Sequence, residues 1–529
     1  MKSSSEKDAS TPHGGGVRGA DNRRQSSLFE GRFGRLFREL PAARHFKEAL
    51  LKLGLEMTAD PEKSKDIPPK PIAAPEIANH LQDDEENTGI PAGYTYLGQF
   101  IDHDITFDPA SSLMQQNDPE SLVDFRTPRL DLDSLYGRGL ADQPYMYLGH
   151  KFRLGKPLFE LDKPSPARDL PRYRDPENLG VPARALIADK RNDENVIVSQ
   201  LHGIFLQLHN RLVDAPEMAG SSFEDIQRMV RWHYQYVVLN DFLPRICGVK
   251  LIDEIMPFRL TSASAANKKP KLQFYHWRNN PFMPLEFSVA AYRFGHSMVR
   301  PIYRLNTQLK GGDDPLQATP DEQQRGLMGR FFIFAGVNKR ALNGFGEFPD
   351  QWAIDWSLFF DIDGSGQKGG SQRSQPAYKI DTSLVNPLGF LPEFSNTITF
   401  TPPLTLDQLQ AKPKDPVNDP ANLAARNLLR GLSLQMPSGQ TIARAMGFPV
   451  IADADLKIGK AILEDLKNAK SITEVDASFK DNAPLWYYLL AEAQHEWFIT
   501  ASKPNSKGNA EPVTLGKVGV ELLLKLLLD

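Results

Sequence analysis

The sequence predicts a mainly α-helical protein, because helical spacing of apolar residues recurs along the chain and alternating strand patterns are few. The clearest case is the segment Val198–Asp214. Its apolar residues follow one another at steps of three and four, which places them on one face of a helix: Val198, Leu201, Phe205, Leu208 and Leu212. We therefore expect a core helix here, within a mainly α fold that has few short strands.

The N-terminal part of the chain contains three kinds of sequence. Residues 1–27 are rich in Ser, Gly and charged side chains, so they cannot bury enough apolar surface to order themselves and are expected to be disordered. Residues 32–57 show helical periodicity, and a proline-rich stretch follows that should run as extended chain over the surface. We read residues 28–89 as an N-terminal helix and proline-rich wrap, with the ordered core beginning near Ile90.

Further helices are expected after the core helix. One runs through Phe287–Val299 and is stopped by Pro301, since proline cannot continue a helix. The others lie near Gln324–Phe334, Ala421–Leu434 and Asn482–Glu496.

Composition excludes several classes of function. The chain has 529 residues, of which 40% are hydrophobic and 24% charged, which is enough for one large domain or two fused ones. The formal net charge of −4 leaves no basic stripe for nucleic acid. One cysteine, Cys247, excludes an intrachain disulfide and fits a reducing compartment. No apolar leader and no run near the roughly 18 apolar residues of a membrane span is present, so we expect a soluble, cytoplasmic protein.

The most informative segment is GYTYLGQFIDHDITF, residues 93–107. If it is helical, Gln99 and His103 are one turn apart and share a face. Asp102 and Asp104 then project to opposite sides of His103, so that one carboxylate reaches what His103 faces and the other a separate site. Alone, such a His-Asp pair is also typical of a capped helix start or of a core histidine with a charged neighbour.

Other candidate residues occur in pairs of the same kind. Arg191 and Glu194 precede the core helix; an arginine near an imidazole stabilises negative charge on a bound oxygen, although this pair could also be a local ion pair. His296 follows Arg293 by one turn and could equally be a hydrogen-bonded core histidine. The remaining pair, Asn427 and Arg430, could be an ordinary pair on a helix surface.

Six short motifs occur in order along the chain: GQFIDHD, TPRLDLDSLYG, KRNDE, LHNRL, YRFGHS and NLLRG. With this set the chain resembles the animal haem peroxidase superfamily, the myeloperoxidase and lactoperoxidase group with its bacterial relatives. The resemblance runs from about Gly93 to Leu528 and implies that residues 90–529 form a single large helical haem peroxidase domain of the bacterial type. It also implies haem b as cofactor, hydrogen peroxide as oxidant, and a small electron donor such as a phenol, iodide, bromide or thiocyanate.

The resemblance assigns roles to the candidate residues. It implies three catalytic side chains: His103, which moves the peroxide proton, Gln99, which orders water, and Arg191, which polarises the O–O bond. It implies that His296 is the proximal ligand of the haem iron and that Asn427 holds its Nδ1–H. Arg293 and Arg430 resemble the partners of the haem propionates.

Two further sets of residues follow from the same resemblance. Asp102 and Glu194 match the carboxylates that form ester bonds to haem in mammalian members, whereas Asn195 stands where myeloperoxidase has a methionine, so a sulfonium link is impossible. Without that link the haem should be a weaker oxidant, with chloride as the poorest donor. The resemblance also implies a Ca²⁺ site with these ligands: Asp104, Thr127, the backbone carbonyl of Arg129, Asp131 and Asp133. The mammalian pattern has serine in place of Asp133.

Three alternatives stay open at this point. A haem-dependent fatty-acid dioxygenase is suggested by the run Tyr275-His276-Trp277, which resembles the cyclooxygenase pattern, but its fourth residue is Arg278 rather than histidine. A non-catalytic interaction protein could keep the same scaffold. The run Asp102-His103-Asp104 could also belong to a non-haem metal phosphohydrolase.

Overall fold

The structure, a computed structural model, describes residues 31–58, 85–107, 123–124, 126–160, 163–256, 274, 281–306, 330–333, 342–362, 374–389, 391, 420–503 and 512–527. The N-terminal segment 1–27, most of the proline-rich stretch and the run Tyr275-His276-Trp277 lie outside these residues. The domain boundaries at residues 27 and 89 therefore stay a prediction.

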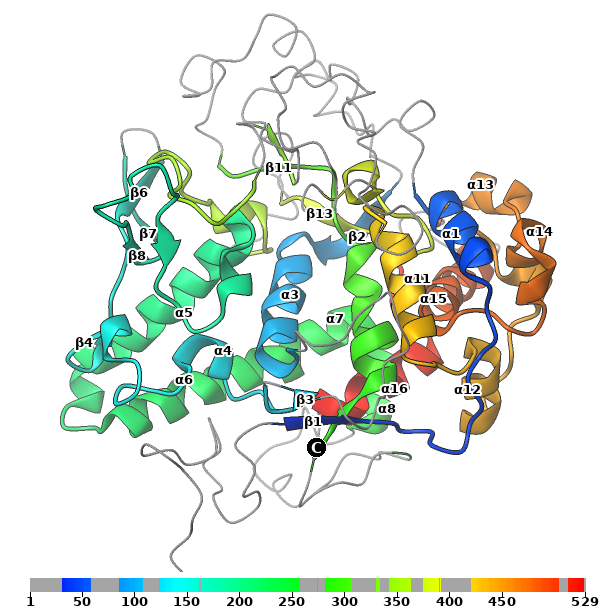
Figure 1. The fold of residues 1–529 in the computed structure, drawn as a ribbon, viewed down its shortest axis with the longest axis horizontal. Helices are drawn as coiled ribbons and strands as arrows, with labels where there is room; N and C mark the ends of the chain where they lie inside the picture. Colours follow the sequence, from blue (N-terminus) through cyan, green and yellow to red (C-terminus); the bar gives the residue numbers. More distant parts are fainter. Residues whose placement is uncertain are drawn as a thin grey trace, which may run out of the picture.

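The fold is mainly α, as the sequence predicts. Its described helices are α1 (Lys47–Glu56), α3 (Gly93–Ile105), α4 (Asp133–Tyr136), α5 (Val196–Asp214), α6 (Phe223–Val237), α7 (Leu243–Cys247), α8 (Val249–Ile255), α11 (Leu423–Ser433), α12 (Gly439–Met446), α13 (Leu463–Asn468), α14 (Ile472–Val475), α15 (Leu485–Ala501) and α16 (Lys517–Leu527). In Figure 1, α3 lies near the middle of the molecule, with α5 and α6 on one side and α11, α12 and α15 on the other.

The described strands are short. They are β1 (Gly31–Gly34), β2 (Glu86–Pro91), β3 (Val123–Asp124), β4 (Tyr147–Leu148), β5 (Lys151–Phe152), β6 (Pro157–Glu160), β7 (Lys163–Arg168), β8 (Arg172–Tyr173), β9 (Arg184–Ala185), β10 (Met283–Pro284), β11 (Ile302–Arg304), β12 (Arg330–Phe332) and β13 (Pro376–Tyr378). Strand β1 pairs with β10 in parallel and with β3 antiparallel; the other pairs are β2–β13, β4–β5, β6–β7, β8–β9 and β11–β12.

Three expected helices differ from the structure. Within residues 32–57 only α1 is helical; Leu36 and Phe37 instead donate their backbone N–H groups to the buried carboxylate of Glu286. The described part of Gln324–Phe334 contains strand β12, because it pairs with β11 across Ile302 and Phe332. The segment through His296 is a π-helical turn (Glu286–Ala290) followed by a 3-10 turn (Ala291–His296), since Ala290 breaks the regular helix at φ −128° and ψ −66°.

Helix α3 is held at its start by a close contact with a distant loop. The backbone N–H of Gly93 donates to the carbonyl of Phe359 at 2.7 Å. A Cβ atom on Gly93 would collide with that carbonyl and with the ring of Phe360, so only glycine allows this approach. The segment that carries His296 is held from the other side, where Trp486 of α15 donates its indole N–H to the carbonyl of Arg293 at 3.1 Å.

No helix in the described part of the chain combines the length and the apolar character that a membrane span needs. The cytoplasmic location expected from the sequence stays a prediction.

The contact between α1 and α11 provides a test of this packing. A Cβ atom on Gly54 of α1 would lie 2.8 Å from the backbone of Ala425 in α11, whereas the space around Gly431 of α11 is open. We expect Gly54→Ala to lower the free energy of unfolding by about 1–3 kcal/mol through overpacking. Gly431→Ala should raise it by up to about 1 kcal/mol, because alanine is the better helix former. Chemical denaturation of the two variants measures both values, and equal effects of the same sign would contradict the described packing.

Candidate functional site

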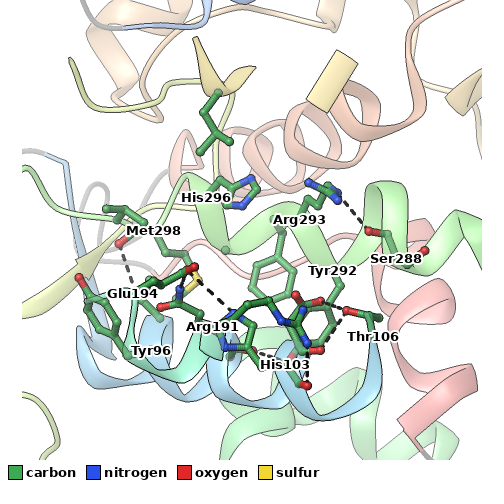
Figure 2. Close-up of a pocket in the computed structure, with 18 of the residues that line it drawn as sticks. Tyr96, His103, Thr106, Arg191, Glu194, Ser288, Tyr292, Arg293, His296 and Met298 are labelled. Atoms are coloured by element: carbon green, nitrogen blue, oxygen red, sulfur yellow. Dashed lines mark hydrogen bonds and ion pairs between the residues drawn. The ribbon is translucent and has the colours of Figure 1, made fainter. Parts of the chain in front are cut away.

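One cavity is lined by nearly all of the predicted catalytic and haem-contacting residues. It has a volume of about 610 Å³, and its lining includes Gln99, Asp102, His103, Arg191, Glu194, Arg293, His296 and Arg430. Figure 2 shows His103 on α3 along one wall and His296 with Arg293 on the facing segment. Of the predicted catalytic and haem-contacting residues, only Asn427 is not in the lining, and it contacts His296 from behind.

His103 is a neutral imidazole, and one of its ring nitrogens contacts a buried asparagine. Its Nδ1 lies 2.8 Å from Oδ1 of Asn192, a residue in the 3-10 turn Lys190–Asp193. Burial, and then the positive charge of Arg191, lower the pKa of His103 to about 3. A neutral ring at neutral pH is the form that can accept a proton.

Arg191 forms its ion pair with Asp189 and not with Glu194. The local Arg191–Glu194 ion pair that the sequence left open is therefore not formed. The guanidinium of Arg191 donates to both carboxylate oxygens of Asp189, at 3.1 and 2.8 Å, and to the backbone carbonyl of His103 at 2.9 Å. It also lies over the ring of Phe107, 4.7 Å from the centroid. Because both partners are fixed, Arg191 lines the cavity in a defined position.

The carboxylates that line the cavity are each bonded to a neighbour. Gln99 donates to Oε1 of Glu194 and accepts from Nδ2 of Asn195 at 3.1 Å. The oxygen of the same Asn195 side chain caps the start of α5. Thr106 donates to Oδ1 of Asp102 at 3.1 Å, and burial raises the pKa of Asp102, opposed by the nearby arginines.

The contact of Asn427 with His296 has the opposite polarity to the one expected from the sequence. Nδ2 of Asn427, not its oxygen, lies 2.8 Å from Nδ1 of His296. The reason is Arg293, which donates from Nη1 to Oδ1 of Asn427 at 2.9 Å; since a guanidinium can only donate, it takes the oxygen. In this structure the Nδ1 of His296 is therefore an acceptor.

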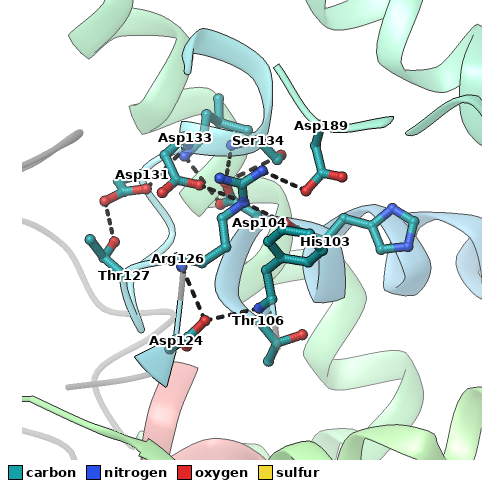
Figure 3. A network of polar contacts seen from close by, with 12 residues as sticks. His103, Asp104, Thr106, Asp124, Arg126, Thr127, Asp131, Asp133, Ser134 and Asp189 are labelled. Atoms are coloured by element: carbon teal, nitrogen blue, oxygen red, sulfur yellow. Dashed lines mark hydrogen bonds and ion pairs between the residues drawn. The ribbon is translucent and has the colours of Figure 1, made fainter. Parts of the chain in front are cut away.

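A second cluster lies behind α3. Carboxylate oxygens of Asp104, Asp131 and Asp133, all buried, lie within 4.8 Å of one another. Oxygens that share one Ca²⁺ ion at about 2.4 Å are at most about 5 Å apart, so the spacing suits that ion. Thr127 donates to Asp131 at 2.5 Å, and the backbone N–H of Arg129 donates to the Thr127 carbonyl at 2.8 Å. Figure 3 shows the His103 ring pointing away from this cluster.

Comparisons with known proteins indicate the family and the fold. Residues 114–333 match the family model for animal haem peroxidase. Over this stretch the chain is similar to the animal haem peroxidase family. The match begins after α3 and ends before α11, so the site residues on these two helices rest on the resemblance in motifs and on the geometry.

Sequence relatives and a solved structure give the extent of the similarity. A peroxidase-like protein of Margaritifera margaritifera is 33% identical over 124 residues, which are 22% of this chain and 14% of the relative. Human thyroid peroxidase is 28% identical over 126 residues, or 22% of this chain and 12% of that protein. The matches thus span less than a sixth of either relative. Peroxidase A of Dictyostelium discoideum superimposes with a TM-score of 0.50 at 15% identity, covering 96% of this chain and 89% of that one, which shows a shared fold.

Two residues of this site, Asp189 and Arg126, were not predicted from the sequence. Arg126 is 5% exposed; its Nη2 lies 2.6 Å from Asp189 and its Nε 3.3 Å from Asp133. The same Nε also donates to the carbonyl of His103 at 3.3 Å. Burial alone would raise the pKa of Asp189, but Arg191 and Arg126 outweigh it and hold that pKa well below its usual range. The sequence signal for Arg126 is weak: it is a basic residue directly before the motif TPRLDLDSLYG.

Arg126 tests how much this buried network contributes. We expect Arg126→Leu to lower the free energy of unfolding by about 3–5 kcal/mol, because it leaves buried carboxylates without their cation. The exposed pair Arg174–Glu347 serves as a control, and Arg174→Leu should change stability little, since exposed ion pairs contribute little. Urea unfolding of the full chain measures both, and a small effect of Arg126→Leu would show that the network is not stabilising.

Proposed function

We propose that this protein is a haem peroxidase that uses hydrogen peroxide to oxidise small electron donors. The observation that carries the proposal is that His103, Gln99, Arg191 and His296 line one cavity. In Figure 2, His103 and Arg191 lie across this cavity from His296. Neither a non-haem phosphohydrolase centre nor an inert scaffold requires a second imidazole on the opposite wall. Function is argued from this site because the fold alone does not determine it.

The residues present fit haem b. A cavity of about 610 Å³ is in the size range of cofactor sites. Burial, and then Arg293, lower the pKa of His296 to about 3, which keeps the ring neutral, as a metal ligand must be. Arg293 and Arg430 line the same cavity and would pair with the propionates. To hold the haem iron, His296 would carry its proton on Nδ1, and Asn427 would then present its oxygen to that proton.

Proton transfer is proposed for the wall of the cavity that carries His103, which we call the distal wall. In the proposed reaction His103 accepts a proton from hydrogen peroxide at Nε2 and returns it to the departing oxygen, while Arg191 stabilises the negative charge that develops there. Gln99, fixed between Glu194 and Asn195, would order water beside them. Bound haem would supply the two electrons that the reduction of peroxide requires.

The proposed donors are phenols, iodide, bromide or thiocyanate. Asn195 supports this choice because it has no sulfur for a covalent link that would make the haem a stronger oxidant, and its side chain is committed to Gln99 and to the start of α5. A panel of donors tests it, and efficient chloride oxidation would contradict the choice.

Asp102 and Glu194 both line the cavity, which supports ester links to haem formed in the presence of peroxide. Mass spectrometry of denatured, peroxide-treated protein would detect haem attached at either residue. Haem that extracts completely into acid solvent would exclude the links.

We also propose that Ca²⁺ binds at Asp104, Thr127, Arg129, Asp131 and Asp133. The support is the close group of three buried carboxylates, whose negative charges the guanidinium of Arg126 beside Asp133 cannot neutralise alone. A strong chelator should lower the melting temperature and the rate of reaction with peroxide, and added Ca²⁺ should restore both. Elemental analysis that finds no calcium in active protein would contradict this site.

The two histidines provide the direct test of the proposed function. His103→Ala should keep haem and slow the reaction with peroxide by about 10²-fold or more, the usual scale for a general acid–base group. His296→Ala should lose haem or bind it weakly, because the iron loses its protein ligand. Visible spectra and stopped-flow mixing with peroxide measure the two effects. Rapid reaction of His103→Ala, or full haem retention by His296→Ala, would refute the corresponding role.

A further inference from the structure

A chain of hydrogen bonds continues from His103 into the protein interior. Nδ1 of His103 lies 2.8 Å from Oδ1 of Asn192, and Nδ2 of the same amide lies 3.0 Å from Nδ1 of His202. Both histidines and the asparagine are buried, at 4%, 0% and 0% exposure for His103, His202 and Asn192. His202 belongs to α5, so the chain joins α3, the 3-10 turn and α5.

The chemistry of the amide assigns the protons along this chain. An amide oxygen only accepts and an amide nitrogen only donates. Oδ1 of Asn192 therefore receives Nδ1–H of His103, which leaves a lone pair on Nε2 of His103 at the cavity side, 3.9 Å from Oε1 of Glu194. Nδ2 of Asn192 gives its hydrogen to the Nδ1 lone pair of His202, and burial lowers the pKa of His202 to about 3, so that this lone pair is available at neutral pH.

The reverse orientation of the amide would disable His103. With Nδ2 towards His103, the ring would have to carry its hydrogen on Nε2, where the peroxide proton must arrive. His202 opposes this orientation as long as its Nδ1 accepts, because the amide oxygen would then face a lone pair. Nε2 of His202 is buried and has no hydrogen-bond partner among the described residues, so Asn192 is the contact that bears on the tautomer of His202. No other hydrogen-bond partner for the Asn192 side chain is found among the described residues beyond these two imidazoles.

We propose that His202 is a positioning residue for the distal base: by accepting from Asn192, it keeps His103 in the tautomer whose Nε2 can take a proton. This inference rests on the proposed role of His103 and extends it to a residue that does not line the cavity. Hydrogen bonds in a buried chain polarise one another, so a proton gained at His103 also strengthens the bond to His202.

Matched variants at His202 separate this role from simple packing. The side-chain amide of asparagine matches the position of imidazole Nδ1, whereas that of glutamine matches Nε2. His202→Asn should therefore keep the acceptor for Asn192, and His202→Gln should lose it. His209 on the same helix serves as control: it is buried, and its ring nitrogens contact Tyr136 at 3.0 Å and the His150 carbonyl at 2.8 Å.

The first measurement is independent of catalysis. Nitrogen NMR of the full chain, labelled with ¹⁵N-histidine and with the His103 signals assigned through His103→Ala, distinguishes the two tautomers. We expect His103 to carry its hydrogen on Nδ1 in the wild type, in His202→Asn and in His209→Gln, and to show both tautomers in His202→Gln. A single Nδ1–H tautomer in His202→Gln would overturn the inference, whatever the protein catalyses.

The second measurement is the rate of reaction with peroxide in the haem-loaded chain. His202→Gln should slow it by about five- to tenfold, the value of one hydrogen bond, while His202→Asn should stay within about twofold of the wild type. Equal rates for the two variants would overturn the inference. If the wild type shows the Nδ1–H tautomer but no reaction with peroxide, the proposed function fails while the positioning of the ring by His202 stands.

Discussion

The site depends on the carboxylate of Asp189, which two arginines share inside the protein. Arg191 and Arg126 both bind it, and both also donate to the backbone carbonyl of His103 near the end of α3. A buried carboxylate and its cations are stable only together, because removal of one partner leaves an uncompensated charge in a medium of low polarity. The pairings thus hold three segments that are distant in sequence, α3, the loop of residues 126–133 and the 3-10 turn before α5, in one arrangement.

This arrangement places two groups of polar side chains on different sides of helix α3. His103 points into the cavity and Asp104 points into the carboxylate cluster behind it, although the two residues are adjacent in the chain (Figure 3). Arg126 connects the sides, since it contacts Asp133 of the cluster as well as Asp189. A change in the carboxylate cluster should therefore alter the positions of His103 and Arg191, because Arg126 contacts both sides. The opposite wall is held separately, by Trp486 of α15 and by Asn427 of α11.

Local patterns predicted much of this site, and long-range pairings account for what they missed. The one-turn spacing of Gln99 and His103 and the position of Arg191 and Glu194 before the core helix are local features. They could therefore be predicted from the sequence. The partners of Arg191, Asn427 and Glu286 depend on tertiary structure. Arg191 pairs with Asp189 instead of Glu194, and Arg293 binds the oxygen of Asn427, so that its nitrogen faces His296. Glu286 accepts from the backbone of Leu36 and Phe37, which are not helical. The same holds for His202, whose position on an apolar helix gave no sign of a contact with Asn192.

The most direct test of this account is a titration of haem into the haem-free full chain, followed by resonance Raman spectroscopy of the reduced form. The central claim is that the walls carrying His103 and His296 enclose one haem site. It predicts saturation at one haem per chain and an iron–imidazole vibration from a single histidine ligand. Binding that does not saturate, or a saturated complex without an imidazole ligand, would contradict it.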